Sequence, residues 1–87
     1  MTHHLKIKEL YYDQIASGEK KFEVRYNDRD YQVGDTIVLN SLGKNGGKIQ
    51  ARIGYIHSGL GLADGYVILG IEVYIEEKKW QNEKLEN

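Results

Sequence analysis

The chain has 87 residues and a formal charge of −1, with 12 basic and 13 acidic side chains. This length predicts one domain with one small core, and the absence of cysteine excludes disulfides, thiolate metal ligands and a thiol nucleophile. Residues 1–75 hold nine Lys/Arg and nine Asp/Glu, which argues against a broad basic track for duplex nucleic acid.

The first part of the chain alternates between strand and helix signals. Residues 4–7 predict a short strand, and residues 9–17 predict a helix with apolar side chains four residues apart. Gly18 follows, where a helix commonly ends on a residue in the left-handed conformation. Residues 20–26 predict a second strand, and the polar residues 27–30 end it with a turn.

The second part of the chain predicts strands only. Residues 36–40 form a compact apolar strand that we expect to be buried on both faces, and residues 43–47 form a glycine-rich hairpin turn. Residues 66–75 form a long, nearly all apolar strand that we expect inside the sheet, after a loop at 58–65. The strand at 48–57 alternates, with one face carrying Ile49, Ala51, Ile53 and Tyr55.

This order of elements predicts a mainly β or α+β domain over residues 1–75, with about five to six strands and one early helix. A small, partly closed barrel would protect the sheet edges of so short a chain. Residues 76–87 form a charged tail. Two alternatives are considered for this tail: a C-terminal helix anchored by Trp80, and a lack of ordered structure.

Residues 21–26 carry the most concentrated set of functional side chains, and they alternate strictly between polar and apolar. One face carries Lys21, Glu23 and Arg25, and the other carries Phe22, Val24 and Tyr26. A strand with an apolar back and a charged front offers a rigid surface for a small polar ligand. The alternative is a solvated sheet face with charge pairs across strands, each contributing roughly 0.2 to 1 kcal/mol.

The motif GxKxxExR at residues 18–25, after a strand and a helix and before a Gly-Asp turn, resembles the ASCH domain of the PUA-like superfamily. A small uncharacterised bacterial and phage family within that superfamily is more similar still. It shares HxLKI at residues 3–7, GEKKFEVRxNDR at 18–29, VGD at 33–35 and GLxxGYVIL at 61–69. The resemblance covers residues 3 to about 75.

This resemblance implies a PUA-like pseudo-barrel with a cleft lined by the Gly-Lys-Glu-Arg strand, in a superfamily that commonly binds RNA or modified nucleosides. Some ASCH relatives are small amidohydrolases that deacylate N4-acetylcytidine with a lysine, a threonine and a glutamate. Their lysine falls on Lys20, but Glu23 stands where they have the threonine. Their glutamate lies in a helical insertion, and the loop at residues 58–65 is too short to hold one.

The candidate site residues suit the recognition of a nucleotide. Arg25 and Arg29 can each form two parallel hydrogen bonds to a phosphate or a base edge, and Lys20 can act as a point charge. Glu23 can accept a hydrogen bond from an exocyclic amine, and Tyr26 or Tyr31 can stack on an unpaired base. The candidate ligand-binding residues are Lys20, Glu23, Arg25, Asn27, Arg29, Tyr26, His3 and Lys6.

Structural roles are the alternative for several of these residues. Glu23 and Arg25 can pair with each other, Asn27 can cap the turn, and His3 can be a surface histidine. Because His3 and His4 are neighbours on a strand, they point to opposite faces and cannot chelate together, so we expect no metal and no cofactor.

Three hypotheses follow for the function. The first is a binding domain for single-stranded RNA or a nucleotide, without chemistry of its own. The second is a small amidohydrolase acting on a modified pyrimidine nucleoside, with Lys20 and Glu23 as the catalytic residues. The third is a protein-interaction module. With no secretion signal and no apolar run of about 20 residues, we expect a cytoplasmic protein outside the membrane.

Overall fold

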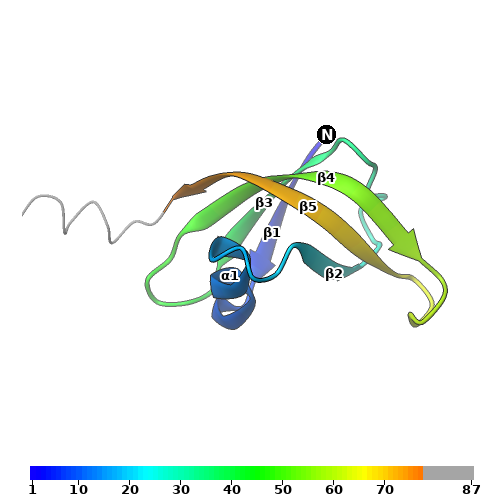
Figure 1. Cartoon of the computed structure of the whole chain (residues 1–87), viewed down its shortest axis with the longest axis horizontal. Helices are drawn as coiled ribbons and strands as arrows, with labels where there is room; N and C mark the ends of the chain where they lie inside the picture. The colour runs from blue at the N-terminus through cyan, green and yellow to red at the C-terminus, as the bar shows by residue number, and fades with distance from the viewer. Residues whose placement is uncertain (78–87) are drawn as a thin grey trace, which may run out of the picture.

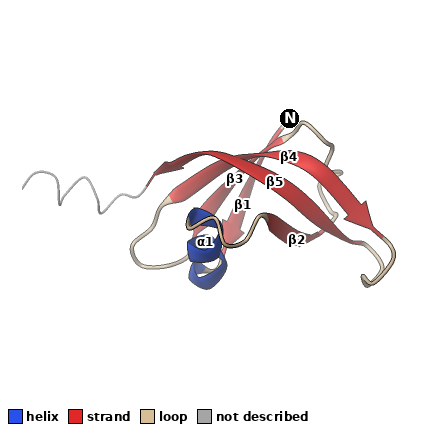
Figure 2. Cartoon of the chain, viewed as in Figure 1, coloured by secondary structure: helices blue, strands red, loops and turns tan. Residues whose placement is uncertain are grey.

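The computed structural model describes residues 1–77, which form a single curled sheet and one helix (Figure 2). The elements in chain order are β1 (Thr2–Ile7), α1 (Glu9–Ala16), β2 (Phe22–Tyr26), β3 (Thr36–Ser41), β4 (Lys48–Ser58) and β5 (Tyr66–Glu77). The predicted fold class, mainly β with one early helix, is confirmed. The prediction of a C-terminal helix around Trp80 lies outside the described residues, and the charged segment predicted from residue 76 overlaps the last two residues of β5.

The sheet has the order β1-β3-β4-β5-β2, so β1 and β2 are its two edges. β1 pairs with β3 in parallel, and the other three pairs are antiparallel. The sheet arches over α1, with β2 beside the helix on the concave side (Figure 1). It is therefore a half-barrel, whose two edge strands are not paired with each other.

The core lies on the concave side of the sheet, and α1 covers it. Its buried apolar side chains are Leu5, Ile7, Tyr12, Ile15, Tyr31, Ile37, Leu39, Ile49, Ala51, Ile53, Val67, Leu69 and Ile71. The strand predicted to be buried on both faces, β3, is so: Ile37 and Leu39 are fully buried on one face and Val38 is buried on the other. α1 ends as predicted, because Gly18 has a φ of 84° and allows the chain to leave the helix.

β4 departs from the predicted alternation at one point. Ile49, Ala51 and Ile53 point into the core as expected, but Tyr55 is exposed. The pairing register between β4 and β5 shifts between Ile53 and Tyr55, so that Gly54 is the extra residue of a bulge. A bulge reverses the face on which the following side chains lie, and this explains the wrong prediction for Tyr55.

β5 is an interior strand as predicted, but only over part of its length. Its residues 67–70 pair with both β2 and β4, and its last residues pair with β4 alone. The apolar side chains of that last part, including Val73 and Ile75, are therefore exposed. Within the part of the chain that the structure describes, no helix has the length and apolar character needed to cross a membrane.

Candidate ligand-binding cleft

The charged face of β2 points into the concavity of the half-barrel. Glu23 is only 4% exposed, whereas Phe22, Val24 and Tyr26 on the other face are 42–56% exposed. The predicted alternation of charged and apolar side chains is confirmed. However, the charged face points to the concave side of the sheet and the apolar face points to solvent, which is the reverse of a strand whose apolar face packs against the core. An edge strand permits this because its concave face borders an open cleft, where buried charges can compensate one another.

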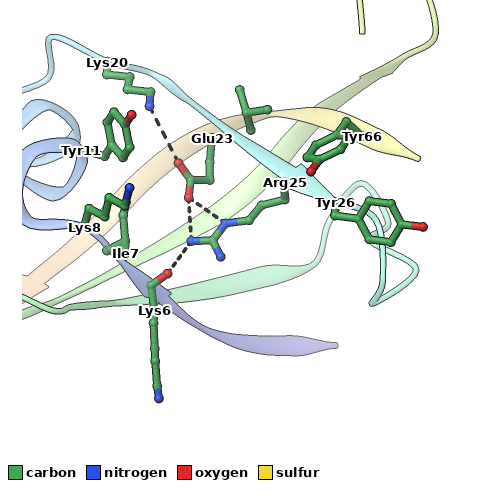
Figure 3. Close-up of a pocket in the computed structure, with 10 residues that line it drawn as sticks. Lys6, Ile7, Lys8, Tyr11, Lys20, Glu23, Arg25, Tyr26 and Tyr66 are labelled. Atoms are coloured by element: carbon green, nitrogen blue, oxygen red, sulfur yellow. Dashed lines mark hydrogen bonds and ion pairs between the residues drawn. The ribbon is translucent and has the colours of Figure 1, made fainter. Parts of the chain in front are cut away.

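Glu23 and Arg25 form an ion pair at the centre of this concave face (Figure 3). The Nε and Nη2 atoms of Arg25 lie 2.8 and 2.7 Å from the same oxygen, Oε2, of Glu23. Nη2 also donates a hydrogen bond of 2.7 Å to the backbone carbonyl of Lys6. Because Lys6 lies in β1, Arg25 links β1 and β2, the two edge strands, which do not pair with each other.

Lys20 reaches the same carboxylate from the turn between α1 and β2. Its Nζ atom lies 4.0 Å from Oε1 of Glu23 and 4.1 Å from the centre of the Tyr11 ring. The centre of the Phe22 ring lies 5.2 Å from the same Nζ atom. The backbone N–H of Lys20 donates to the carbonyl of Gln14 in α1. The turn is thereby held to the helix, and the ammonium group lies near two rings and a carboxylate.

These residues surround a cleft of about 530 Å³, within the range of small-molecule sites. It is lined by Lys6, Ile7, Lys8, Tyr11, Lys20, Glu23, Val24, Arg25, Tyr26 and Tyr66. The charged side chains among them are four basic and one acidic, on a chain whose formal charge is −1. The three groups that the sequence places on one extended segment, Lys20, Glu23 and Arg25, therefore converge on one concave pocket.

One rim of the cleft is made by two tyrosines. Tyr26 in β2 and Tyr66 in β5 are opposite each other in the strand register, and their rings meet edge to face with centroids 5.4 Å apart. Gly65 has a φ of 84°, and a Cβ atom there would lie 2.5 Å from the Tyr26 ring. Only glycine fits this position without moving that ring.

One oxygen atom of Glu23 and one nitrogen atom of Arg25 remain available for hydrogen bonds in the cleft. Oε1 of Glu23 and Nη1 of Arg25 have no hydrogen-bond partner within residues 1–77. In the same residues, every fully buried side-chain nitrogen or oxygen atom has such a partner. Both atoms are therefore reachable by solvent, and they offer an acceptor and a donor to a bound molecule.

His3 lies in the interior and not at the surface, so the expectation of a surface histidine is wrong. It is 4% exposed, its Nε2 atom lies 2.8 Å from Oδ2 of Asp35, and its ring meets the Tyr31 ring edge-on at 4.9 Å. The parallel pairing of β1 with β3 places His3 opposite Ile37, close to Asp35. His3 does not line the cleft; it connects β1 to the start of β3.

The contacts of Asp35 favour its charged form. The hydrogen bond from His3 is the main cause, and together with the Gln32 backbone N–H it lowers the pKa of Asp35 to about 2 despite the opposing effect of burial. Because an ionised carboxylate only accepts hydrogen bonds, Nε2 of His3 is the donor. Burial raises the pKa of the neighbouring Tyr31, and Arg25 and Arg29 oppose that rise.

The remaining predicted residues have other places. Asn27 does not line the cleft: its Oδ1 atom accepts the backbone N–H of Tyr31 at 3.1 Å, which is the turn-capping alternative. Arg29 is exposed and outside the cleft lining. Lys6 contributes its carbonyl oxygen, while its ammonium group points away from Glu23 (Figure 3).

Five lining residues were not among the predicted site residues: the apolar Ile7 and Val24, and also Lys8, Tyr11 and Tyr66. Lys8 and Tyr11 lie three residues apart at the start of α1, which brings both side chains to the cleft. Tyr66 is opposite Tyr26 only because of the register between β2 and β5. Among residues 1–77, no group of three or more His, Cys, Asp or Glu side chains is placed to hold a metal ion.

Comparison with known proteins agrees with the expected kinship to uncharacterised phage proteins. The chain is 33% identical over 70 residues to the "Uncharacterized 12.9 kDa protein in GpA 3'region" of Escherichia phage P2. That match takes in 77% of this chain and 64% of the phage protein, so the chain spans less than two thirds of that relative.

A solved structure and a family match complete the comparison. The crystal structure of hypothetical protein PH0355 has a TM-score of 0.62 and 18% identity, over 85% of this chain and 100% of that one; identity this low shows a shared fold alone. Residues 2–71 match the family described as "Domain of unknown function (DUF3850)". Because this match covers most of the chain, the protein belongs to the DUF3850 family.

Proposed function

We propose that the cleft between β1 and β2 binds single-stranded RNA or a nucleotide, as a PUA-like (ASCH) binding domain without chemistry of its own. The observation that carries this proposal is the gathering of basic and aromatic side chains in one cavity of a nearly neutral chain. Four of the 12 basic residues line a single cleft together with three tyrosines, and all four except Lys6 direct their charged groups towards it. A positive, aromatic-lined groove is the usual means of binding unpaired nucleotides.

The charges of the cleft divide into two groups with different tasks. Glu23 occupies one edge of the Arg25 guanidinium and lies 4.0 Å from Lys20, so its one negative charge balances only one of these two cations. These contacts leave Oε1 of Glu23 and Nη1 of Arg25 to bond the edge of a base. Lys8 has no acidic partner within residues 1–77, and its ammonium group is free to meet a phosphate.

The aromatic rim supplies the remaining part of the proposed recognition. Tyr66 is 42% and Tyr26 is 56% exposed, so ring surface is open to a ligand. Stacking of a base on an aromatic side chain contributes about 1–3 kcal/mol in single-strand binders. The edge-to-face contact and the close approach of Gly65 hold the Tyr26 ring in place before a ligand arrives.

Fluorescence anisotropy with labelled tetranucleotides, RNA in one arm and DNA in the other, tests the proposal. We expect binding that weakens with salt, and Lys8→Ala should reduce the slope of log K against log[salt] by about 0.7, the value for one phosphate contact on a single strand. Lys44→Ala is the matched control, because Lys44 is an exposed lysine outside the cleft lining. Equal effects of the two substitutions, or no binding to either nucleic acid, would refute the proposal.

Hydrolysis of a modified pyrimidine nucleoside is the second candidate, and one observation favours it. Oε1 of Glu23 is a carboxylate oxygen 4.0 Å from the Lys20 ammonium inside the cleft, so a group that can transfer a proton lies beside a cation that can stabilise negative charge. Incubation with N4-acetylcytidine and related acylated nucleosides, followed by chromatography, separates this candidate from pure binding. Turnover that Lys20→Ala abolishes would support hydrolysis, and a complete lack of turnover would leave binding alone.

A further inference from the structure

A second cavity lies on the other side of the turn between α1 and β2. It has a volume of about 370 Å³ and opens between the end of α1 and the middle of β5. Its walls include Ile15, Ile71 and Val73, which are apolar, and Ser17 and Lys21, which are polar. The cavity shares no wall with the cleft except Lys20, which lines both.

Because Lys20 lines both cavities, the two cavities are adjacent. The Lys20 ammonium lies 4.1 Å from the centre of the Tyr11 ring and 5.2 Å from that of Phe22, and both contacts favour this position of the side chain. The turn that carries it is bonded on both sides, by Lys20 N–H to the Gln14 carbonyl and by Ile71 N–H to the Lys21 carbonyl. A chain of nucleotides that leaves the cleft over Lys20 therefore meets a preformed second hollow.

The sizes of the cavities indicate more than one unit of ligand. Each of them, at about 530 and 370 Å³, falls in the range of about 300–1,000 Å³ that holds one small molecule. One nucleotide does not fill both. The cation between them is where a phosphate that links two nucleotides would lie, and an apolar wall such as that of Ile71 and Val73 suits a base.

The charge around the second cavity fits the same occupant. Lys20 and Lys21 line it with one acidic residue, Glu72, whose carboxylate is engaged by Arg52 at 3.1 Å. The local balance is thus positive, although less so than in the cleft. This balance suits the phosphate of a nucleic-acid strand and disfavours a cationic ligand.

From these observations, and resting on the proposed function of the cleft, we infer that the ligand is a strand of at least two nucleotides, whose second nucleotide occupies the cavity between α1 and β5. Lys20 then bridges the two subsites, and Lys21 contacts the phosphate of the second one. The protein then binds short single strands, and a free mononucleotide occupies only one of the two subsites.

Titration calorimetry with AMP and CMP against the dinucleotides pApA and pCpC tests this inference. We expect each dinucleotide to bind about fivefold or more tightly than its mononucleotide, because a second base is buried against the apolar wall and a second phosphate meets Lys21. Val73→Glu places a carboxylate in the second cavity only, at a residue that is 45% exposed and tolerates substitution. It should abolish the gain for dinucleotides and leave mononucleotide binding within about twofold, and Lys21→Ala should reduce the gain.

The failures of the two proposals are distinguishable. If mononucleotides bind the cleft but dinucleotides bind no more tightly, the second subsite is refuted and the proposed function stands. The same conclusion holds if the gain is present and survives both Val73→Glu and Lys21→Ala, because the second nucleotide then lies elsewhere. If neither mononucleotides nor dinucleotides bind, the proposed function fails and this inference fails with it.

Discussion

Replacing Arg25 by methionine should destabilise the fold strongly, although the residue lies on an edge strand. The substitution leaves the Glu23 carboxylate, 4% exposed, without its two donors at 2.8 and 2.7 Å, and it removes the bond to the Lys6 carbonyl. Removing one partner of a buried ion pair costs about 3–5 kcal/mol. Because the Arg25 side chain is 23% exposed and Lys20 remains near Glu23, we expect a loss of about 2–3 kcal/mol.

A double-mutant cycle separates this pair from a general effect of substitution. Arg25→Met, Glu23→Met and the double variant are unfolded with urea and followed by far-ultraviolet circular dichroism. Removing both charges leaves no unpaired carboxylate in the cleft, so the double variant should be about 2 kcal/mol more stable than the sum of the single losses predicts. For a domain with a stability of order 5 kcal/mol, this difference is well resolved.

The surface pair Arg52–Glu72 is the matched control for this cycle. Its atoms are 3.1 Å apart, but its side chains are 49% and 73% exposed. The corresponding methionine cycle should give a coupling below about 1 kcal/mol, because solvent screens exposed pairs. A Glu23–Arg25 coupling no larger than that of the control would refute the argument that a buried charge cluster joins the two edges of the sheet.

Three other predictions concern stability. Since the folded-state pKa of Asp35 is lowered to about 2 from 3.8, its contribution is present above pH 3.8 and is lost as the pH falls towards 2; the stability difference between the wild type and Asp35→Asn, followed by thermal unfolding, should therefore shrink over that interval, and a constant difference would contradict it. Gly65→Ala should cost about 1–3 kcal/mol and shift the NMR signals of the Tyr26 ring, because its Cβ atom meets that ring. Gly59→Ala, with a similar φ and open space, should cost less and leave Tyr26 unchanged. Leu39→Ala, at a fully buried position, should cost about 2–5 kcal/mol in urea unfolding, and a cost below about 1 kcal/mol would contradict the packing described for β3.

The order of elements was predictable because each one carries a local signal. Apolar runs, the glycine-rich turn at residues 43–47 and Gly18 after the helix all act within a few residues, and the structure has a strand, turn or helix end at each. The wrong prediction for Tyr55 has a different cause, which is not local. A bulge at Gly54 depends on the partner strand, and nothing in the alternation of β4 reveals it.

The candidate site was predictable in its centre and not in its surroundings. Lys20, Glu23 and Arg25 belong to one short segment, so their proximity follows from strand geometry. Which face of β2 is buried depends on contacts from distant elements, such as the Lys6 carbonyl in β1, and the sequence does not display these. The burial of His3 likewise depends on Asp35, 32 residues away, which the parallel pairing of β1 with β3 brings beside it.

The central claim is that the cleft between β1 and β2 is a nucleotide site, and an NMR titration of the ¹⁵N-labelled protein with a short single-stranded RNA tests it most directly. We expect the backbone signals of residues 6–11, 20–26 and 66 to move together and to saturate. The hairpin turn at residues 43–47, outside the cleft lining, should remain unchanged. Shifts that are absent from residues 20–26, or that gather at the hairpin turn, would contradict the account.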